Sequence, residues 1–284
     1  MSNLLEAIVN ISEAHTLTLP AIVGATRNRA NAVGEQMEIF VKDAFAGTIG
    51  VAEGPPKMRA YANCFSWLGS PNNPPDAMIR QGDAIEIKKL ETAVHQIQLN
   101  SSYPKDKLRA DNSMITSACR EAERWVEKDL IVAVGHVEHG LIRALDLVYG
   151  DLYAADHSVY DQIKLRIERG INEIPGISLD ATNELARINR VDPLGRTSLR
   201  VRGMWLLDVP RISFAQCYPT PPAGTEFQLF CLVRTTKLQS MPLGNQKSLA
   251  TISGLSIDNI QVQDPNNGAK LIHCTRIIYR RSRQ

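Results

Sequence analysis

Three side chains near the end of the first third of the chain could together hydrolyse a phosphodiester bond. They lie in the stretch NPPDAMIRQGDAIEIKKLE, residues 73–91. Side chains alternate along an extended segment, so Glu86 and Lys88 project from one face. Hard cations such as Mg²⁺ bind carboxylate oxygens, water and phosphate. We expect Asp76 and Glu86 to hold Mg²⁺, and Lys88 to orient the attacking water and stabilise charge on the phosphorane.

The same stretch also fits a hydrophilic hairpin that performs no chemistry. A Glu-x-Lys triplet occurs by chance on many strands, whereas Pro-Asp followed by Glu-x-Lys after a hairpin-length gap is more specific. Asp83 follows a glycine, so we expect it to cap the turn and not to bind metal. We expect Lys89 and Glu91 to lie at the solvent edge of the strand.

The elements that position these residues follow a mixed α/β pattern. Apolar residues at helical spacing predict a helix over 31–45, which carries two candidate acids, Glu38 and Glu35. The residues alone leave open which of the two joins the site. The fold class that follows is α/β, with a central mixed sheet flanked by helices and a strand-rich C-terminal part. We expect strands over 61–68, 84–90, 129–135, 141–154, 197–209, 226–235 and 269–279, and further helices before Pro20 and over 115–127 and 158–171.

The charge distribution indicates a polyanionic partner. Residues 1–186 contain 18 Lys and Arg against 25 Asp and Glu, whereas residues 187–284 contain 14 against 5. The two parts therefore carry net charges of −7 and +9, and such asymmetry favours a partner such as DNA, RNA or an anionic membrane for the basic part.

Two sets of polar residues are candidates for contact with that partner. Arg200 and Arg202 share one face of a predicted strand, and Arg196 flanks them. Arginine is suited to bidentate contacts with guanine or phosphate. The alternative is a solvated sheet face with salt bridges to the acidic part. The second set is the polar loop after the catalytic strand, which is either an ordinary surface loop or a phosphate-binding loop. Its candidate residues are Asn100, Ser101, Ser102 and Lys105.

The sequence favours a cytoplasmic location. It also favours a reaction without a covalent enzyme intermediate. No apolar run approaches the roughly 20 residues of a membrane helix, and the first residues lack a basic signal region. The five cysteines are isolated and show no CxxC pairing, which favours reduced core thiols. No defensible Ser/His/Asp or Cys/His group is present, which agrees with direct attack by water.

Four segments resemble one family of nucleases. They are NPPDAMIRQGDAIEIKKLE, QLNSSYPKDKL, VYGDLYAAD and DPLGRTSLRVRGMW, in this order along the chain. Together they resemble the type II restriction endonucleases of the NgoPII-like family, in the PD-(D/E)xK nuclease superfamily. The likeness runs from about residue 28 to about residue 210. In this resemblance Asp76, Glu86 and Lys88 match the catalytic triplet, and Glu38 matches the glutamate of a GxxxE setting.

The resemblance implies an Mg²⁺-dependent homodimer that cuts both strands of a short palindromic site in double-stranded DNA, GGCC-like in the namesake. It implies a restriction-modification system, with a cognate DNA methyltransferase as genetic partner. We expect one domain over 1–284, with a catalytic core at about 28–175 and a recognition part at about 187–284. The alternatives are a repair or junction nuclease with the same core, and a DNA-binding protein without catalysis.

Overall fold

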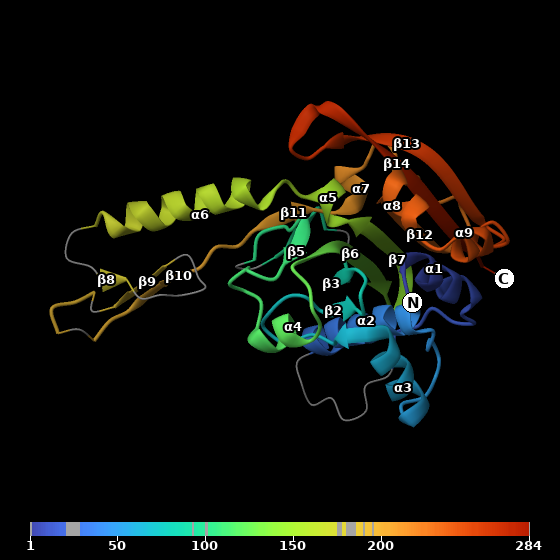
Figure 1. Cartoon of the computed structure of the whole chain (residues 1–284), viewed down its shortest axis with the longest axis horizontal. Coiled ribbons are helices and arrows are strands. Elements are labelled where there is room, and N and C mark those ends of the chain that lie inside the picture. Colours follow the sequence, from blue (N-terminus) through green and yellow to red (C-terminus); the bar gives the residue numbers. More distant parts are fainter. Residues whose placement is uncertain are drawn as a thin grey trace.

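The computed structural model is built around one large mixed sheet (Figure 1). It describes residues 2–20, 29–92, 94–99, 102–174, 178–179, 186–189, 191–194 and 196–283, and the backbone alone at 29–33 and 178–179. The strand order is β1-β2-β3-β6-β7-β12-β14-β13, and β5 pairs with β6. The strands are β1 (Phe65–Trp67), β2 (Ala77–Ile79), β3 (Ala84–Leu90), β5 (Lys107–Arg109), β6 (Glu127–Glu138), β7 (Leu141–Tyr149), β12 (Thr225–Arg234), β13 (Leu255–Asp264) and β14 (Asn267–Ser282).

The sheet is mixed because two of its neighbouring pairs are parallel. β3 pairs with β6 and β7 pairs with β12 in parallel, whereas β1–β2, β2–β3, β6–β7, β12–β14 and β13–β14 are antiparallel. The central strands are almost wholly buried, as expected for strands covered on both faces. Strands from both ends of the chain therefore share one core, which confirms the predicted fold class.

Helix α2 (Arg29–Ala46) carries Glu38 and packs against β3. The predicted apolar face is buried: Met37, Phe40, Val41, Ala44 and Phe45 all lie in the core. The helix approaches the sheet closely at Gly135, where an added Cβ would lie 2.3 Å from the Met37 Cε atom. A larger residue at that position would require the Met37 side chain to move.

The other helices of the body are short. They are α1 (Leu4–Glu13), α3 (Pro55–Cys64), α4 (Ser117–Glu121), α5 (Gly150–Tyr153), α7 (Pro210–Ser213), α8 (Thr235–Ser240) and α9 (Leu243–Leu249). α1 begins at an Asn3 cap, whose side chain accepts from two backbone N–H groups, and buries five residues. In the described part of the chain, no helix is both long enough and apolar enough to cross a lipid bilayer.

An arm projects from the body between residues 157 and 201 (Figure 1). It consists of α6 (His157–Asn172) and a small antiparallel sheet of β8 (Ser178–Leu179), β9 (Ala186–Asn189) and β10 (Leu199–Val201). The chain then returns to the body, where β11 (Leu206–Asp208) pairs with β4 (Gln96–Gln98).

Several predicted elements differ from the observed ones. Residues 61–64 end helix α3, and only 65–67 form a strand. The predicted helix over 115–127 is confined to α4 because β6 begins at Glu127. The predicted strand over 197–209 is two short strands in different sheets, and the strand over 141–154 ends at Tyr149 and continues as α5. In each case pairing or packing with distant residues ends the element.

Candidate active site

Asp76 and Glu86 face each other across the β2–β3 hairpin. The strand register pairs Ala77 with Ile85, so Asp76 is the next residue opposite Glu86. The Asp76 backbone N–H donates to the Ile85 carbonyl at 3.1 Å, and the Asp76 carboxylate accepts from the Ile87 N–H at 2.6 Å. Two main-chain contacts thus hold one carboxylate beside the other. The hairpin therefore brings Asp76 beside Glu86, as expected from the sequence.

Lys88 lies on the same face as Glu86, as the sequence predicts. Its Nζ atom is 2.7 Å from Glu86 Oε1, and both side chains are mostly shielded from solvent, with 24% and 20% exposed. Although burial opposes it, the charges of Glu86 and Asp76 raise the pKa of Lys88 to about 12. Lys88 therefore remains an ammonium at neutral pH, and it can donate hydrogen bonds but cannot accept a proton from water.

The two carboxylates have pKa values shifted in opposite directions. Burial, followed by the charges of Glu86 and Glu38, raises the pKa of Asp76 to about 7. Burial also acts on Glu86, but the charges of Lys88 and Lys105 outweigh it and lower the pKa of that carboxyl. Negative charge is therefore crowded at Asp76, which is the setting in which a cation is favourable.

Glu38 contributes to this electrostatic group from helix α2. Its charge raises the pKa values of both Asp76 and Lys88, and its carboxylate accepts a hydrogen bond from Lys42 at 3.1 Å. Lys42 also donates to the Leu68 carbonyl, which ties the helix to the segment before the hairpin. Glu35 is exposed on the same helix and does not figure in the charge effects on Asp76 or Lys88. The geometry brings Glu38 toward the site.

The donor set fits a magnesium ion that keeps several water ligands. Asp76 and Glu86 use one oxygen each in the contacts above, so each has a second oxygen for a metal. No group of three or more His, Cys, Asp or Glu side chains in the described residues is arranged as a metal site. One or two carboxylates completed by water and substrate phosphate is the usual arrangement for Mg²⁺.

Lys105 brings a second ammonium group to the site. Its Nζ atom donates to the Ser102 hydroxyl and lies 5.9 Å from the centre of the Tyr103 ring. Burial together with the charge of Lys88 lowers the pKa of Lys105, whereas Glu86 opposes that shift. The polar loop thus places Ser102 and Lys105 beside the carboxylates. Asn100 and Ser101, predicted in the same loop, lie outside the described residues.

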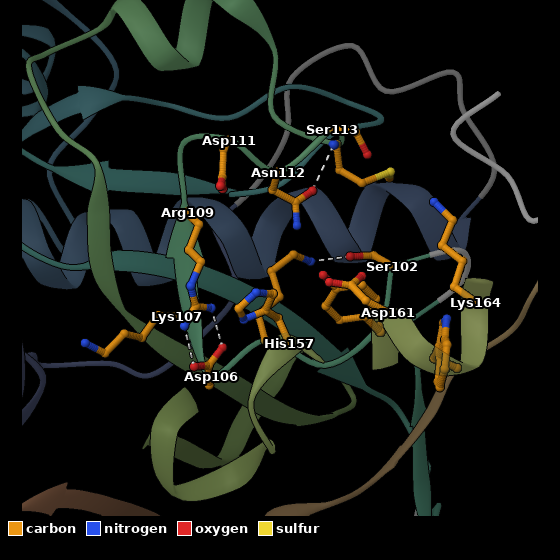
Figure 2. A pocket seen from close by; sticks show the side chains of 14 residues that line it. Ser102, Asp106, Lys107, Arg109, Asp111, Asn112, Ser113, His157, Asp161 and Lys164 are labelled. Carbon is orange, nitrogen blue, oxygen red and sulfur yellow. Dashed lines mark hydrogen bonds and ion pairs between the residues drawn. The ribbon is translucent and has the colours of Figure 1, made fainter. Parts of the chain in front are cut away.

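A pocket of about 350 Å³ opens beside Lys105 (Figure 2). Ser102, Tyr103 and Lys105 line both this pocket and a smaller one that reaches Glu86. Figure 2 shows Asp106 and Arg109 paired in the wall, with Asp161 and Lys164 of α6 also facing the pocket. The pocket therefore extends the candidate site along the surface, and it could accept the strand next to a reacting phosphate.

The close approach of Gly150 holds the Lys105 segment in place. A Cβ added at Gly150 would lie 2.4 Å from the Lys105 carbonyl oxygen and 2.6 Å from that of Asp106. Sequence reasoning did not identify this glycine, although it lies in the VYGDLYAAD segment. Gly69 has a similar role, since its φ is +95° and an added Cβ would lie 2.6 Å from the Asp76 carbonyl oxygen.

Sequence reasoning also missed an aromatic cluster beside the pocket. The Tyr103 ring stacks on Tyr160 at 5.2 Å, and Trp205 packs edge-on against both rings. Trp67 packs against the core, but Trp205 is half-buried in the pocket wall. The cluster joins residues far apart in the chain, so no local pattern indicates it.

The predicted arginines lie in the arm and not beside the carboxylates (Figure 1). Arg200 is directly opposite Arg187 in the β9–β10 pair, and Arg202 follows β10. Arg196, Arg200 and Arg202 are all exposed. Arg187 and Arg200 therefore lie side by side on one face of this small sheet.

Asp83 is expected to cap the turn, but its carboxylate contacts residues that are distant in the chain. Its buried carboxylate accepts from the Tyr149 hydroxyl at 2.6 Å and from Lys237 at 2.7 Å. Lys237 also contacts Asp129 at 2.7 Å. These bonds tie the hairpin turn to β7 and α8. Asp83 and Lys237 therefore link parts of the fold that are distant in the chain, which local sequence does not reveal.

Comparisons with known proteins identify one family. The model of the NgoPII restriction endonuclease family matches residues 2–265. The type II restriction enzyme NgoPII of Neisseria gonorrhoeae is 40% identical over 280 residues, which cover 98% of this chain and 99% of that protein. No solved structure matches the chain.

A mixed sheet with paired carboxylates and a lysine on its hairpin, together with this match, defines a restriction-endonuclease-like enzyme. The chain belongs to the NgoPII restriction endonuclease family. It is a type II restriction endonuclease, a hydrolase that cleaves DNA in a restriction system. The resemblance seen in the sequence is thereby confirmed.

Proposed function

We propose that this enzyme cuts both strands of a short palindromic site in double-stranded DNA, with Mg²⁺ as cofactor and as a homodimer. The observation that carries the proposal is the placement of Asp76, Glu86 and Lys88 on one hairpin face in a member of this family. A Mg²⁺ ion bound there lowers the pKa of a water ligand and neutralises charge on the phosphate.

The residues of the chain have separate roles in this proposal. Asp76 and Glu86 would hold the cation; main-chain contacts fix the Asp76 carboxylate, and Lys88 contacts that of Glu86. Lys88 is held protonated, so it donates a hydrogen bond to the attacking water or to a phosphate oxygen. Glu38 adds negative charge from α2, in preference to Glu35. Attack in line with the leaving oxygen then cleaves the bond without a covalent protein intermediate.

The DNA contacts are proposed for two regions. Ser102 and Lys105 lie next to the carboxylates and would bind phosphates beside the cut, as would the neighbouring Asn100 and Ser101. Arg196, Arg200 and Arg202 give the arm a basic face that suits phosphates or guanine edges. The sheet shared by β3 and β14 supports one domain over 1–284, with recognition concentrated in the basic C-terminal part.

The finer statements of this proposal come from the family resemblance. They are a GGCC-like site, a cognate methyltransferase that protects the host DNA, and a cytoplasmic location. A repair or junction nuclease with the same core would cut by DNA structure, whereas a DNA-binding protein without catalysis would leave the strands intact.

A plasmid digest tests these alternatives directly. Discrete fragments in Mg²⁺, and intact plasmid in a chelator, are the expected result. Sequencing of the fragment ends would give the site and the offset between the two cuts. Smearing would instead indicate a nuclease without site specificity. Intact plasmid with a gel shift would indicate a binding protein and would contradict the proposal.

A further inference from the structure

Helix α6 leaves an apolar face uncovered within the described chain. The helix has 16 residues and none of them is buried. Ten of the seventeen exposed large apolar side chains among the described residues lie between positions 159 and 206. A helix of this length is only marginally stable in water without packing. The concentration of exposed apolar residues therefore indicates that something covers α6 in the functional protein.

Four apolar residues of α6 form a continuous ridge. Val159, Ile163, Ile167 and Ile171 follow one another at intervals of four, so they lie along one side of the helix. Rows at this spacing are the ridges through which helices pack against each other. Val159, Ile163 and Ile167 are 45%, 44% and 38% exposed. Aliphatic side chains at this spacing suit another helix and do not suit a phosphate backbone.

The pattern is symmetric about the middle of the helix. If two copies of α6 pack antiparallel, Ile163 meets Ile167 of the partner subunit, and Val159 meets Ile171 of the partner subunit. Lys164 and Glu168 flank the ridge on one side, four residues apart. The same antiparallel register places Lys164 opposite Glu168 of the partner subunit, and the reverse, so the charges are self-complementary.

The root of the arm is fixed, so the ridge is presented in a set direction. Tyr160 at the start of α6 and Trp205 on the returning chain pack against each other at 5.6 Å, and Tyr160 also stacks on Tyr103. The Tyr160 hydroxyl accepts a hydrogen bond from the Ala155 N–H at 3.1 Å. Two arms held in this way could pair without a conformational change.

We propose that α6 is a dimerisation surface, covered by α6 of a second copy in antiparallel orientation. The inference rests on the proposed function, because each chain has one Asp76, Glu86 and Lys88 group and a palindromic site must be cut once in each strand. It goes further by assigning the residues that make the contact. The basic face of the β9–β10 sheet remains available to DNA.

Two substitutions on opposite faces of α6 test the surface. Ile163→Glu places a charge in the ridge, and Leu165→Glu places the same charge on the opposite face, where the leucine is 50% exposed. We expect the wild-type chain to be a dimer by sedimentation equilibrium. Ile163→Glu should raise the dimer dissociation constant roughly 100-fold, and Leu165→Glu should leave it unchanged. Circular dichroism and thermal unfolding would establish that both variants fold.

A charge-exchange experiment tests the register. In a homodimer of Lys164→Glu, the new glutamate faces Glu168 of the partner subunit, so carboxylates face carboxylates. In a homodimer of Glu168→Lys, the new lysine faces Lys164 of the partner subunit, so ammonium groups face ammonium groups. Each should weaken its homodimer roughly tenfold. An equimolar mixture should form a heterodimer with all pairs restored. Each substitution also removes the Lys164–Glu168 ion pair within its own helix, and mixing the two variants cannot restore that pair. Recovery of dimer affinity on mixing would therefore identify a contact between subunits.

The outcomes separate this inference from the proposed function. A monomeric wild-type chain, equal effects of Ile163→Glu and Leu165→Glu, or no recovery on mixing would overturn the α6 interface, whatever the plasmid digest shows. A wild-type dimer that dissociates on Ile163→Glu, but cuts no DNA in Mg²⁺, would support the interface and contradict the proposed function.

Discussion

Asp76 binds the main chain on both sides of Glu86. Its N–H donates to the carbonyl of Ile85, and its carboxylate accepts from the N–H of Ile87. The position of the Asp76 carboxylate is therefore set by the backbone on both sides of Glu86, whereas the Glu86 carboxylate is held by Lys88. Groups held so firmly need little reorganisation when a cation and a phosphate arrive, which is the requirement for electrostatic catalysis.

The dependence of cutting on Mg²⁺ should change with pH. Burial, then Glu86 and Glu38, raise the pKa of Asp76 to about 7. Below that value the carboxyl holds a proton that must leave before a cation binds, and above it the carboxylate is free to bind. The half-saturating Mg²⁺ concentration should therefore rise about tenfold per unit as pH falls below 7, and level off above it. Cleavage rates against Mg²⁺ concentration between about pH 6 and 8 measure this, and a constant midpoint would contradict it.

Lys88→Ala should remove cutting and preserve DNA binding. The ammonium group lies 2.7 Å from Glu86 and stabilises charge at the phosphate in the proposed reaction. We expect the cleavage rate to fall by a factor of about 1,000 or more, a typical effect of removing one such donor. Lys89→Ala is the matched control, because that neighbour projects from the other face and pairs with Glu91. Single-turnover cleavage and a gel shift give the two readouts, and retained cutting in Lys88→Ala would show that the site is elsewhere.

Gly150→Ala should displace the Lys105 segment. The added methyl group would lie within 2.4–2.6 Å of two carbonyl oxygens. We expect a loss of about 1–3 kcal/mol in the free energy of unfolding and a lower cleavage rate. Gly244→Ala serves as control, because nothing lies within 4 Å of its added Cβ and it is in a helix. Urea unfolding and cleavage assays on both variants measure the effect. Equal behaviour of the two alanine variants would show that the contact at Gly150 is relieved by small movements.

Asp146 should make the protein less stable as pH rises. Burial raises the pKa of Asp146 to about 7, although the Tyr218 hydroxyl donates to it at 2.8 Å and opposes the shift. The folded chain holds this proton up to about pH 7, whereas the unfolded chain releases it near pH 3.8. The stability contributed is thus full below about pH 4 and lost as pH rises toward 7, by up to about 4 kcal/mol.

The variant Asp146→Asn keeps an acceptor for Tyr218 and removes the titration. Unfolding free energies of both proteins at several pH values should show wild type losing stability relative to the variant between about pH 4 and 7. Parallel curves would mean that Asp146 is ionised in the folded protein.

The hairpin that brings Asp76, Glu86 and Lys88 together could be predicted because its signals are local. Period-two alternation places Glu86 and Lys88 together, and the turn length returns the chain to Asp76. The α2 face could be predicted for the same reason. The position of Lys105 could not, because it depends on β5 pairing with β6 and on the close approach of Gly150.

The errors arise where distant residues decide local structure. Residues 61–64 are expected in a strand but end a helix, in which Tyr61 donates to Asp43 and Lys57 pairs with Asp43. Asp83 resembles a turn cap until Tyr149 and Lys237 are placed beside it. The sequence predicts a helix over 158–171 and a strand over 197–209, but hydrophobic periodicity does not indicate that these segments project from the body as an arm.

The position of β14 has a consequence for the timing of enzyme activity during synthesis. β14 lies inside the sheet, between β12 and β13, and buries residues such as Cys274, Ile277 and Ile278. A chain still on the ribosome lacks this strand until residues 267–282 have emerged, so its sheet is incomplete and its core is exposed. We therefore expect cleavage activity to appear only after residues 267–282 have been synthesised and have joined the sheet.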